Sequence, residues 1–445
     1  MIKTNFLILV LAGALSISSH AQFEAFAAKY DLLTTIAGAG QMDDRGSSGW
    51  NESFEGGSAI EAELSRPHFA MADRHGNIYI ADKEGHAIRK VDPAGIITTV
   101  AGTNSAGDNG DGRAVDCQLS SPNGVWVKAD GTFFILDLGN SKIRRVDTEG
   151  NMLTLVDDPG GISLGRGLWV SQDEKLIYYV SGSRIKKWTG TGGIEIYAEG
   201  FASPGHIIVD PSGKLVVSDR GANRVYRLSD DGSKLSIAGN GSASGGGSGF
   251  QARETGLDGV RGVWFMEDQS YLLATHEGSQ IWYVDSAGVI NLFLDGRDGD
   301  EYHSGDGEHF QTPGYKISEA RGVSVDYDGN IIITENDLGF IRKIERKEST
   351  SVELIHDLKP AFNVQVYPNP VLVSASISYE LNMPDQVKLT VYKHTGQEVS
   401  VLVDQLQMAG VHSVTFNACK QGSGIYIYSL SVGSHEQQGQ FLQLK

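Results

Sequence analysis

Three arginines stand in the same short phrase at different places in the chain: Arg166 in RGLWV, Arg261 in RGVWF and Arg321 in RGVSV. A guanidinium group donates two parallel hydrogen bonds to a carboxylate, sulfate or phosphate, so three of them held together would form an anion site. The chain has 37 Lys and Arg against 55 Asp and Glu, a net charge of −18, so such a site would be local. Alternatively, each arginine fastens a neighbouring connection by pairing with one of its acidic residues, the candidates being Asp157, Asp258 and Glu319.

The elements that would position these arginines are internal repeats. The stretch 67–103 returns as 121–156 and 203–240, and weaker copies follow. Each copy holds four short apolar runs separated by Gly, Asn and Asp turns, which predicts one four-stranded antiparallel sheet. Such sheets bury both faces only against their neighbours, so the sequence predicts an all-β fold, a six-bladed β-propeller. The predicted innermost strands begin at Pro67, Pro122, Gly165, Pro204, Val260 and Ala320.

Aligning the innermost strands brings the three arginines together with His68 and Asn123 at the mouth of the central channel. His206 falls one residue later than His68, and because strand side chains alternate, we expect the two rings on opposite faces. A catalytic zinc needs three converging protein ligands, and no third histidine is available there. The remaining histidines of the repeats are predicted to be surface residues of turns and connections: His75, His86, His276, His303 and His309.

The sixth copy lacks its outermost strand. The orphan run LLTTIAG at Leu32 to Gly38 has no strands of its own before it, so it is predicted to complete blade six and close the ring. Val352 to Ile355 is the competing candidate.

Charged residues recur inside the repeats. The acids that end the second strands are interpreted as structural, accepting amide hydrogens of turns: Asp82, Asp137, Asp219 and Glu335. The basic residues of the third strands are predicted to form a solvated face: Arg89, Lys90, Arg144, Arg145, Lys186, Lys187, Arg342 and Lys343.

Two remaining features could bind metal or form a crosslink. Asp108, Asp111 and Asp306 lie in glycine-rich connections whose oxygens could hold calcium, although a structural turn is the favoured interpretation. No other cofactor is predicted. Cys117 is expected to be semi-buried and, like the distant Cys419, unpaired.

The blades resemble NHL repeats. The resemblance is carried by AGDNGDGRAVDCQLSSPNGVWV, ILDLGNSKIRRVD, VVSDRGANRVYRL and IADKEGHAIRKVD, whereas blades three and five depart from the pattern. NHL propellers include sensor ectodomains, RNA-binding modules, scaffolds and a zinc-dependent lyase, so the resemblance implies the fold and leaves the function open. The negative charge argues against nucleic-acid binding.

Both ends of the chain suggest export. Residues 1–21 have the basic start, apolar run and small-x-small end of a signal peptide, and no later segment is apolar and long enough to span a membrane. We expect the propeller over 22–346, a linker over 347–361 and a small β-sandwich over 362–445, where short alternating strands replace the repeat.

This last segment resembles a type A sorting domain of the type IX secretion system. The match rests on Tyr367, Pro368, Asn369 and Pro370, then LTVYKHTGQEV and GSGIYIYSLSV, in that order. The resemblance implies a Gram-negative source, interaction with the secretion machinery, and release or surface attachment after the tail is removed.

The function expected from these features is that of a secreted or cell-surface binding or scaffold module. Its partner would be a protein, peptide or glycan on the loop-rich face of the propeller. The alternative is an extracellular metal-dependent lyase or lactone hydrolase with its site in the propeller channel.

Overall fold

The computed structural model describes residues 19–40, 48–190, 192–296, 303–314, 316–347 and 362–444, except 363, 382–384, 396, 409, 419–421 and 433–434. The chain divides into two compact units, Met1–Lys347 and Glu348–Lys445. No helix among these residues is long and apolar enough to cross a membrane.

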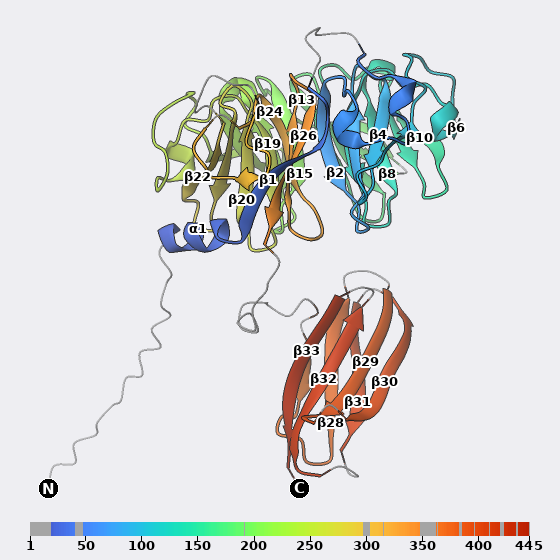
Figure 1. The fold of residues 1–445 in the computed structure, drawn as a ribbon, viewed down its shortest axis with the longest axis vertical. Helices are drawn as coiled ribbons and strands as arrows, with labels where there is room; N and C mark the ends of the chain where they lie inside the picture. Colours follow the sequence, from blue (N-terminus) through green and yellow to red (C-terminus); the bar gives the residue numbers. More distant parts are fainter. Residues whose placement is uncertain are drawn as a thin grey trace, which may run out of the picture. The chain divides into compact units, whose positions relative to one another are not determined.

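The first unit is a six-bladed β-propeller (Figure 1). From the innermost strand outward, blade 1 is β2 (Pro67–Ala72), β3 (Ile78–Asp82), β4 (Ala87–Val91) and β5 (Ile97–Ala101), and blade 2 is β7 (Pro122–Val127), β8 (Phe133–Asp137), β9 (Lys142–Val146), β10 (Asn151–Asp157) and β6 (Gly112–Arg113). Blade 3 is β11 (Leu168–Val170), β12 (Leu176–Ser181), β13 (Arg184–Thr189) and β14 (Gly192–Glu199), and blade 4 is β15 (Pro204–Val209), β16 (Leu215–Asp219), β17 (Arg224–Leu228) and β18 (Lys234–Ala238). Blade 5 is β19 (Val260–Phe265), β20 (Tyr271–Thr275), β21 (Gln280–Val284) and β22 (Ile290–Asp295), and blade 6 is β24 (Ala320–Val325), β25 (Ile331–Glu335), β26 (Phe340–Arg346), β1 (Tyr30–Ala37) and β23 (Glu308–His309). Five innermost strands begin where the repeat predicts, whereas β11 begins at Leu168 instead of Gly165.

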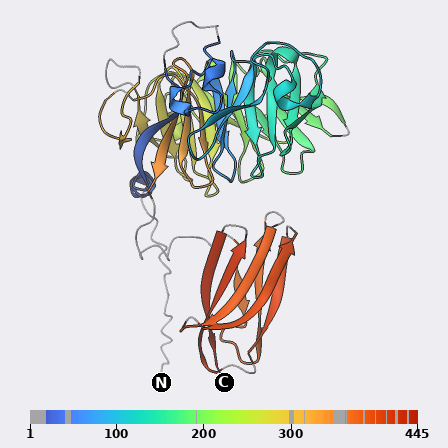
Figure 2. The same cartoon turned by 45° about the vertical axis from the view of Figure 1, so that its right-hand side comes forward.

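Short helices lie in the crossovers, which are the connections from the outer strand of one blade to the inner strand of the next. They are η1 (Glu52–Phe54), η2 (Ala59–Glu61), η3 (Ala114–Asp116) and η6 (Ala252–Glu254), and η4 (Leu138–Asn140) and η5 (Arg220–Ala222) lie in turns. The turn after the second strand meets the crossover, since Gly139 donates to the carbonyl of Ser120 at 2.7 Å. Figure 2 shows crossover helices near one face of the ring and α1 (Ser19–Ala27) near the other.

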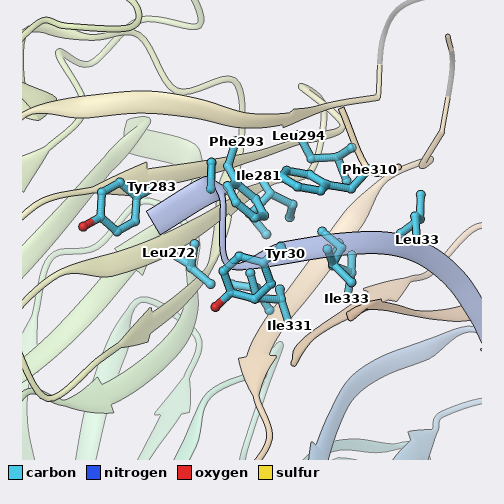
Figure 3. Packing of buried hydrophobic residues seen from close by; sticks show 14 of the residues in the cluster. Tyr30, Leu33, Leu272, Ile281, Tyr283, Phe293, Leu294, Phe310, Ile331 and Ile333 are labelled. Carbon is cyan, nitrogen blue, oxygen red and sulfur yellow. The ribbon is translucent and has the colours of Figure 1, made fainter. Parts of the chain in front are cut away.

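The N-terminal strand closes the ring, as the sequence predicts. β1 pairs antiparallel with β26, with Thr34 opposite Lys343. Phe26 of α1 stacks on Tyr283 of blade 5 with ring centroids 4.1 Å apart, and Leu33 of β1 is fully buried. Figure 3 shows these elements packing in one core between blades 5 and 6. The competing segment 352–355 lies outside the described residues.

The third-strand arginines are not a solvated face, which corrects the prediction. Arg89, Arg144 and Arg342 are fully buried, and each pairs with the acid that ends its second strand. Their sequence neighbours remain partly exposed, since strand side chains alternate.

The second-strand acids do have a structural role, but their amide partners lie in the crossovers. Asp82 accepts from Ser65 N at 2.5 Å and Asp137 from Ser120 N at 2.8 Å. Each acid therefore joins its blade to the crossover that enters it.

The second unit contains two sheets. One is β27 (Gln365–Tyr367), β28 (Ser374–Leu381) and β31 (Gly410–Asn417), and the other is β30 (Glu398–Gln407), β29 (Asp385–Lys393), β32 (Gly424–Val432) and β33 (His435–Gln443). Both sheets contribute to one apolar core, which includes Ile377 and Leu389. Tyr426 and Tyr428 are buried in it, so they are packing residues. Of the two cysteines, Cys117 is free and buried instead of semi-buried, and Cys419 lies outside the described residues.

Candidate functional site

A β-bulge at the start of the innermost strand aims side chains at the channel. In blade 5, Val260 faces Thr275 while Gly262 faces Ala274, so two residues of one strand oppose one of the other, and Arg261 is the extra residue. The same shift occurs at Arg321 in blade 6 and at Asn123 in blade 2. Bulges re-aim side chains in this way.

Four of the five residues predicted at the channel mouth line one small cavity of about 20 Å³: His68, Arg166, Arg261 and Arg321. The fifth, Asn123, does not line it. Its side-chain amide donates instead to the carbonyl of Gly165 in the next blade. The repeat therefore brings the three arginines together from blades 3, 5 and 6.

His206 lines the same cavity as His68, contrary to the prediction of opposite faces. In blades 1 and 4 the irregularity spans Pro67 to Ala70 and Pro204 to Ile207, which interrupts the period-two alternation on which that prediction depended. The ring of His206 stacks on Phe69 across the channel, with centroids 4.3 Å apart.

The channel is narrow at this level because glycines adjacent to the cavity-lining residues let the innermost strands approach one another closely. A Cβ on Gly322 would lie 2.7 Å from the ring of Phe69, and one on Gly205 would lie 2.8 Å from the carbonyl oxygen of Arg261. Further along the inner strands three tryptophans approach one another: Trp126, Trp169 and Trp264. The cavity thus lies at the crossover end of the channel, and the tryptophans lie further along it.

Arg321 is held by protein acceptors. Its guanidinium lies 3.3 Å from Glu319 and 3.8 Å from Asp337, and it donates to Nε2 of His68 at 2.9 Å. His68 must therefore carry its proton on Nδ1, which donates to the carbonyl of Arg66 at 3.1 Å. Burial and the positive charge of Arg321 hold the pKa of His68 well below its usual range.

Arg261 has a different environment. Its side chain is only 4% exposed, and neither Nε nor Nη1 forms a hydrogen bond within the described residues. Burial lowers its pKa to about 8, and the charges of Arg321 and Arg166 act in the same direction. Arg166 is partly exposed, and its Nη1 donates a long hydrogen bond of 3.4 Å to the carbonyl of Leu164. The alternative prediction, in which each arginine pairs with an acid of a neighbouring connection, therefore holds for Arg321 but not for Arg261.

The sequence does not predict Glu277 beside the arginines, whereas Glu319 is a predicted arginine partner and does pair with Arg321. His276 is buried, not on the surface as predicted, and its Nε2 lies 2.8 Å from Glu319. Glu277 pairs with Arg220. Although burial alone would raise it, hydrogen bonds from His276 and Arg220 hold the pKa of Glu277 at about 2. The signal for these residues is blade 5's departure from the repeat, where THEG replaces an Asp-led turn.

The three aspartates considered for calcium face donors of the protein. Asp108 lies 2.7 Å from Arg144, Asp111 accepts from the hydroxyl of Thr154 at 2.7 Å, and Asp306 lies 3.1 Å from Arg342. Within the described residues no three His, Cys, Asp or Glu side chains are grouped as metal ligands.

Fold and site together define a β-propeller with a basic pocket at one end of its channel. Residues 33–109 match the Teneurin NHL domain, and residues 365–442 match the secretion system C-terminal sorting domain. The chain therefore combines NHL repeats with a C-terminal sorting domain of the type IX secretion system. The sorting domain makes it a secreted or cell-surface protein.

Curated relatives match over short stretches. Protein SUPPRESSOR OF QUENCHING 1, chloroplastic, of Arabidopsis thaliana is 37% identical over 20% of this chain and 9% of its own length. Human Teneurin-4 is 35% identical over 19% of this chain, and the match spans 4% of its own length.

Solved structures support the fold. A structural genomics protein of unknown function from Bacteroides thetaiotaomicron is 14% identical, with a TM-score of 0.55 over 70% of this chain and 75% of that one. An auxiliary nutrient binding protein from Bacteroides ovatus is 16% identical, with a TM-score of 0.52 over 72% of this chain and 78% of that one.

Proposed function

We propose that the propeller is an extracellular binding module that captures a small anion, or the acidic group of a peptide or glycan, at the channel mouth. The observation that carries this proposal is that Nε and Nη1 of Arg261 form no hydrogen bond within the described residues, although the side chain is buried beside a cavity that Arg166 and Arg321 also line. A buried charge without an acceptor is costly, and a ligand carboxylate or sulfate would supply the missing acceptors.

The size of the cavity limits what enters it. About 20 Å³ holds one water-sized atom, so a single ligand oxygen would enter while the rest of the ligand lies over the crossovers. The partly exposed Arg166 would contact the ligand at the entrance. Arg321, already bound to Glu319 and His68, would stabilise the charge without moving.

The test is titration calorimetry of the full chain with sulfate and with a blocked glutamate peptide. A hydrogen bond to a charged group contributes about 1.5–3 kcal/mol. We therefore expect the double variant Arg166→Gln, Arg261→Gln to bind at least about 100-fold more weakly. Its melting temperature should stay level or rise, because a buried unpaired cation is removed.

The control is Arg227→Gln in blade 4, which pairs with Asp210 at 2.6 Å and should bind normally. If neither probe binds the parent protein, or if the double variant melts at a markedly lower temperature, the arginines only fasten loops. A binding protein would then have to use its acidic crossovers.

The route of export is also proposed. We infer a signal peptide over 1–21, whose residues 1–18 lie outside the described part, and removal of the tail after passage across a Gram-negative outer membrane. The buried side chains of α1, Phe23, Phe26 and Ala27, all follow that segment. The domain limits of 22–346 and 362–445 rest on the same reasoning. No grouping of described residues favours the metal-dependent lyase or lactone hydrolase over a binding module.

A further inference from the structure

In four of the six blades, the entering crossover covers the outer edge of the sheet. β6 pairs antiparallel with β10 in blade 2, and β23 pairs antiparallel with β1 in blade 6. Blades 1 and 5 use single bridges, Ser58 with Ile96 and Gln251 with Val289. In the described part of the chain, β14 of blade 3 and β18 of blade 4 end their sheets with no such partner.

The covering segments also make a repeated side-chain contact. In three blades a side-chain oxygen of the crossover accepts a hydrogen bond from a backbone amide of the outer strand. Glu55 accepts from Thr99 at 2.8 Å, Asp111 from Thr154 at 3.0 Å and Ser248 from Leu292 at 2.9 Å. In blade 2 the same carboxylate lies 3.3 Å from the buried Arg144. The protein thus binds its own crossover segments at these edges, through a carboxylate in blades 1 and 2 and a hydroxyl in blade 5.

Blade 3 has an equivalent position on its outer strand β14, but no described crossover segment covers it. Ile196 lies opposite Lys186, as Thr154 lies opposite Arg144, and the register shift that follows is the same in both blades, so we expect its amide to face the open edge as that of Thr154 does. The crossover into this blade is short. Its Asp158 turns inward to Lys186 at 2.6 Å instead of reaching the outer strand.

A groove of about 670 Å³ lies beside this edge. Its apolar wall includes Leu155, Trp188 and Ile196, and Ile196 is 51% exposed. Arg184 and Lys186 also line it. Its carboxylates Asp157, Asp158 and Glu195 are paired with Lys142, Lys186 and Lys187, and Arg184 lies 3.4 Å from Glu199.

We propose that this groove binds an extended acidic segment of a partner protein, added antiparallel to β14. An Asp or Glu of the segment accepts the Ile196 amide near Lys186 and Arg184, and a neighbouring apolar side chain packs on Trp188. Strand addition at an open edge supplies affinity through main-chain hydrogen bonds, and the groove supplies specificity. Blade 4 is a poorer receiver, because Tyr226 occupies the position of Lys186.

The probe is a fluorescent peptide with the sequence of residues 105–116, the crossover that covers blade 2, titrated into the full-length protein and followed by anisotropy. We expect saturable binding, weakened at least about tenfold when the peptide's Asp108 and Asp111 are replaced by Asn. Ile196→Glu should abolish binding, and Trp188→Ala should weaken it. The control is Leu235→Glu at the blade 4 edge, where Leu235 is 61% exposed and precedes Ser236, the residue equivalent to Ile196.

Three outcomes would overturn the proposal. One is no saturation of binding up to about millimolar peptide, a concentration at which even a weak complex forms. Another is equal loss in the Ile196→Glu and Leu235→Glu variants, which would remove the preference for blade 3. The third is a wild-type dimer in sedimentation that Ile196→Glu converts to monomer, because a second copy would then occupy the edge.

Discussion

Two adjacent arginines of β9, Arg144 and Arg145, both pair with acids but differ in burial. Arg144 is fully buried between Asp137 at 3.1 Å and Asp108 at 2.7 Å, whereas Arg145 is partly exposed and pairs with Glu174 at 2.7 Å. Burial raises the pKa of Asp137, which indicates how much its ionised form depends on the arginine and the Ser120 amide. The buried pair specifies the position of the crossover, and the exposed pair contributes little to stability.

Arg144→Met should therefore destabilise the propeller strongly. It leaves Asp137 buried with one charged partner fewer, and breaking a buried pair costs about 3–5 kcal/mol in the free energy of unfolding. Arg145→Met is the matched control on the next residue and should cost less than about 1 kcal/mol. Denaturant unfolding of both variants measures the difference, and equal losses would contradict the role assigned to the buried pair.

His206 predicts a specific pH dependence. Burial lowers its pKa to about 4, against about 6.5 in the unfolded chain. Between these values the unfolded chain binds more protons, so stability falls as the pH falls from about 6.5 to about 4, by about 3 kcal/mol. His206→Gln can keep the bond to the Val263 carbonyl and does not titrate, so its loss over this range should be smaller.

The remaining loss in that variant comes from His68, whose pKa is also lowered. Unfolding free energies measured at about pH 7 and about pH 4.5 compare the two proteins. An identical drop in both would show that His206 is already protonated in the folded state.

At the scale of elements, ring closure depends on β1, a strand far in sequence from its partner. Leu33 is fully buried between blades 5 and 6, whereas Thr34 points to the partly exposed side. Closure protects the edge of β26, which would otherwise present unpaired backbone groups.

Leu33→Ala should cost about 2–5 kcal/mol in the free energy of unfolding, because it leaves a cavity in that core. Thr34→Ala in the same strand should change it by about 0.5 kcal/mol or less. Thermal unfolding followed by circular dichroism distinguishes the two. Similar melting temperatures for both variants would mean that β1 does not contribute to the cooperative unit.

The repeat could predict the blades and the convergence of three arginines, because equivalent positions of the innermost strands in a closed ring all lie around its central axis. It could not predict which side of the strand His206 would take, since a bulge inserts one residue and reverses the alternation. It also could not distinguish Arg144 from Arg145, because both fit an alternating strand, and which face is buried depends on the crossover that covers it.

At the scale of the whole molecule, the propeller and the C-terminal sandwich have separate hydrophobic cores. The core of the second unit contains only residues of that unit, among them Val371, Ile377 and Phe441. Units that bury their apolar residues independently fold independently. The proposed binding site and the sorting domain therefore lie in different units of the chain, and we expect that either can be changed without the other.

Removal of residues 348–445 should thus leave the propeller folded and able to bind its ligands, but retained inside the outer membrane of a bacterium that carries the type IX system. The melting temperature of the purified propeller should match that of the same unit in the full chain, because no core residue is lost. Cell fractionation locates the truncated chain, and the intact chain in the same strain is the control. Normal surface delivery of the truncated chain would show that export does not depend on the tail, whereas loss of folding would show that the two cores are coupled.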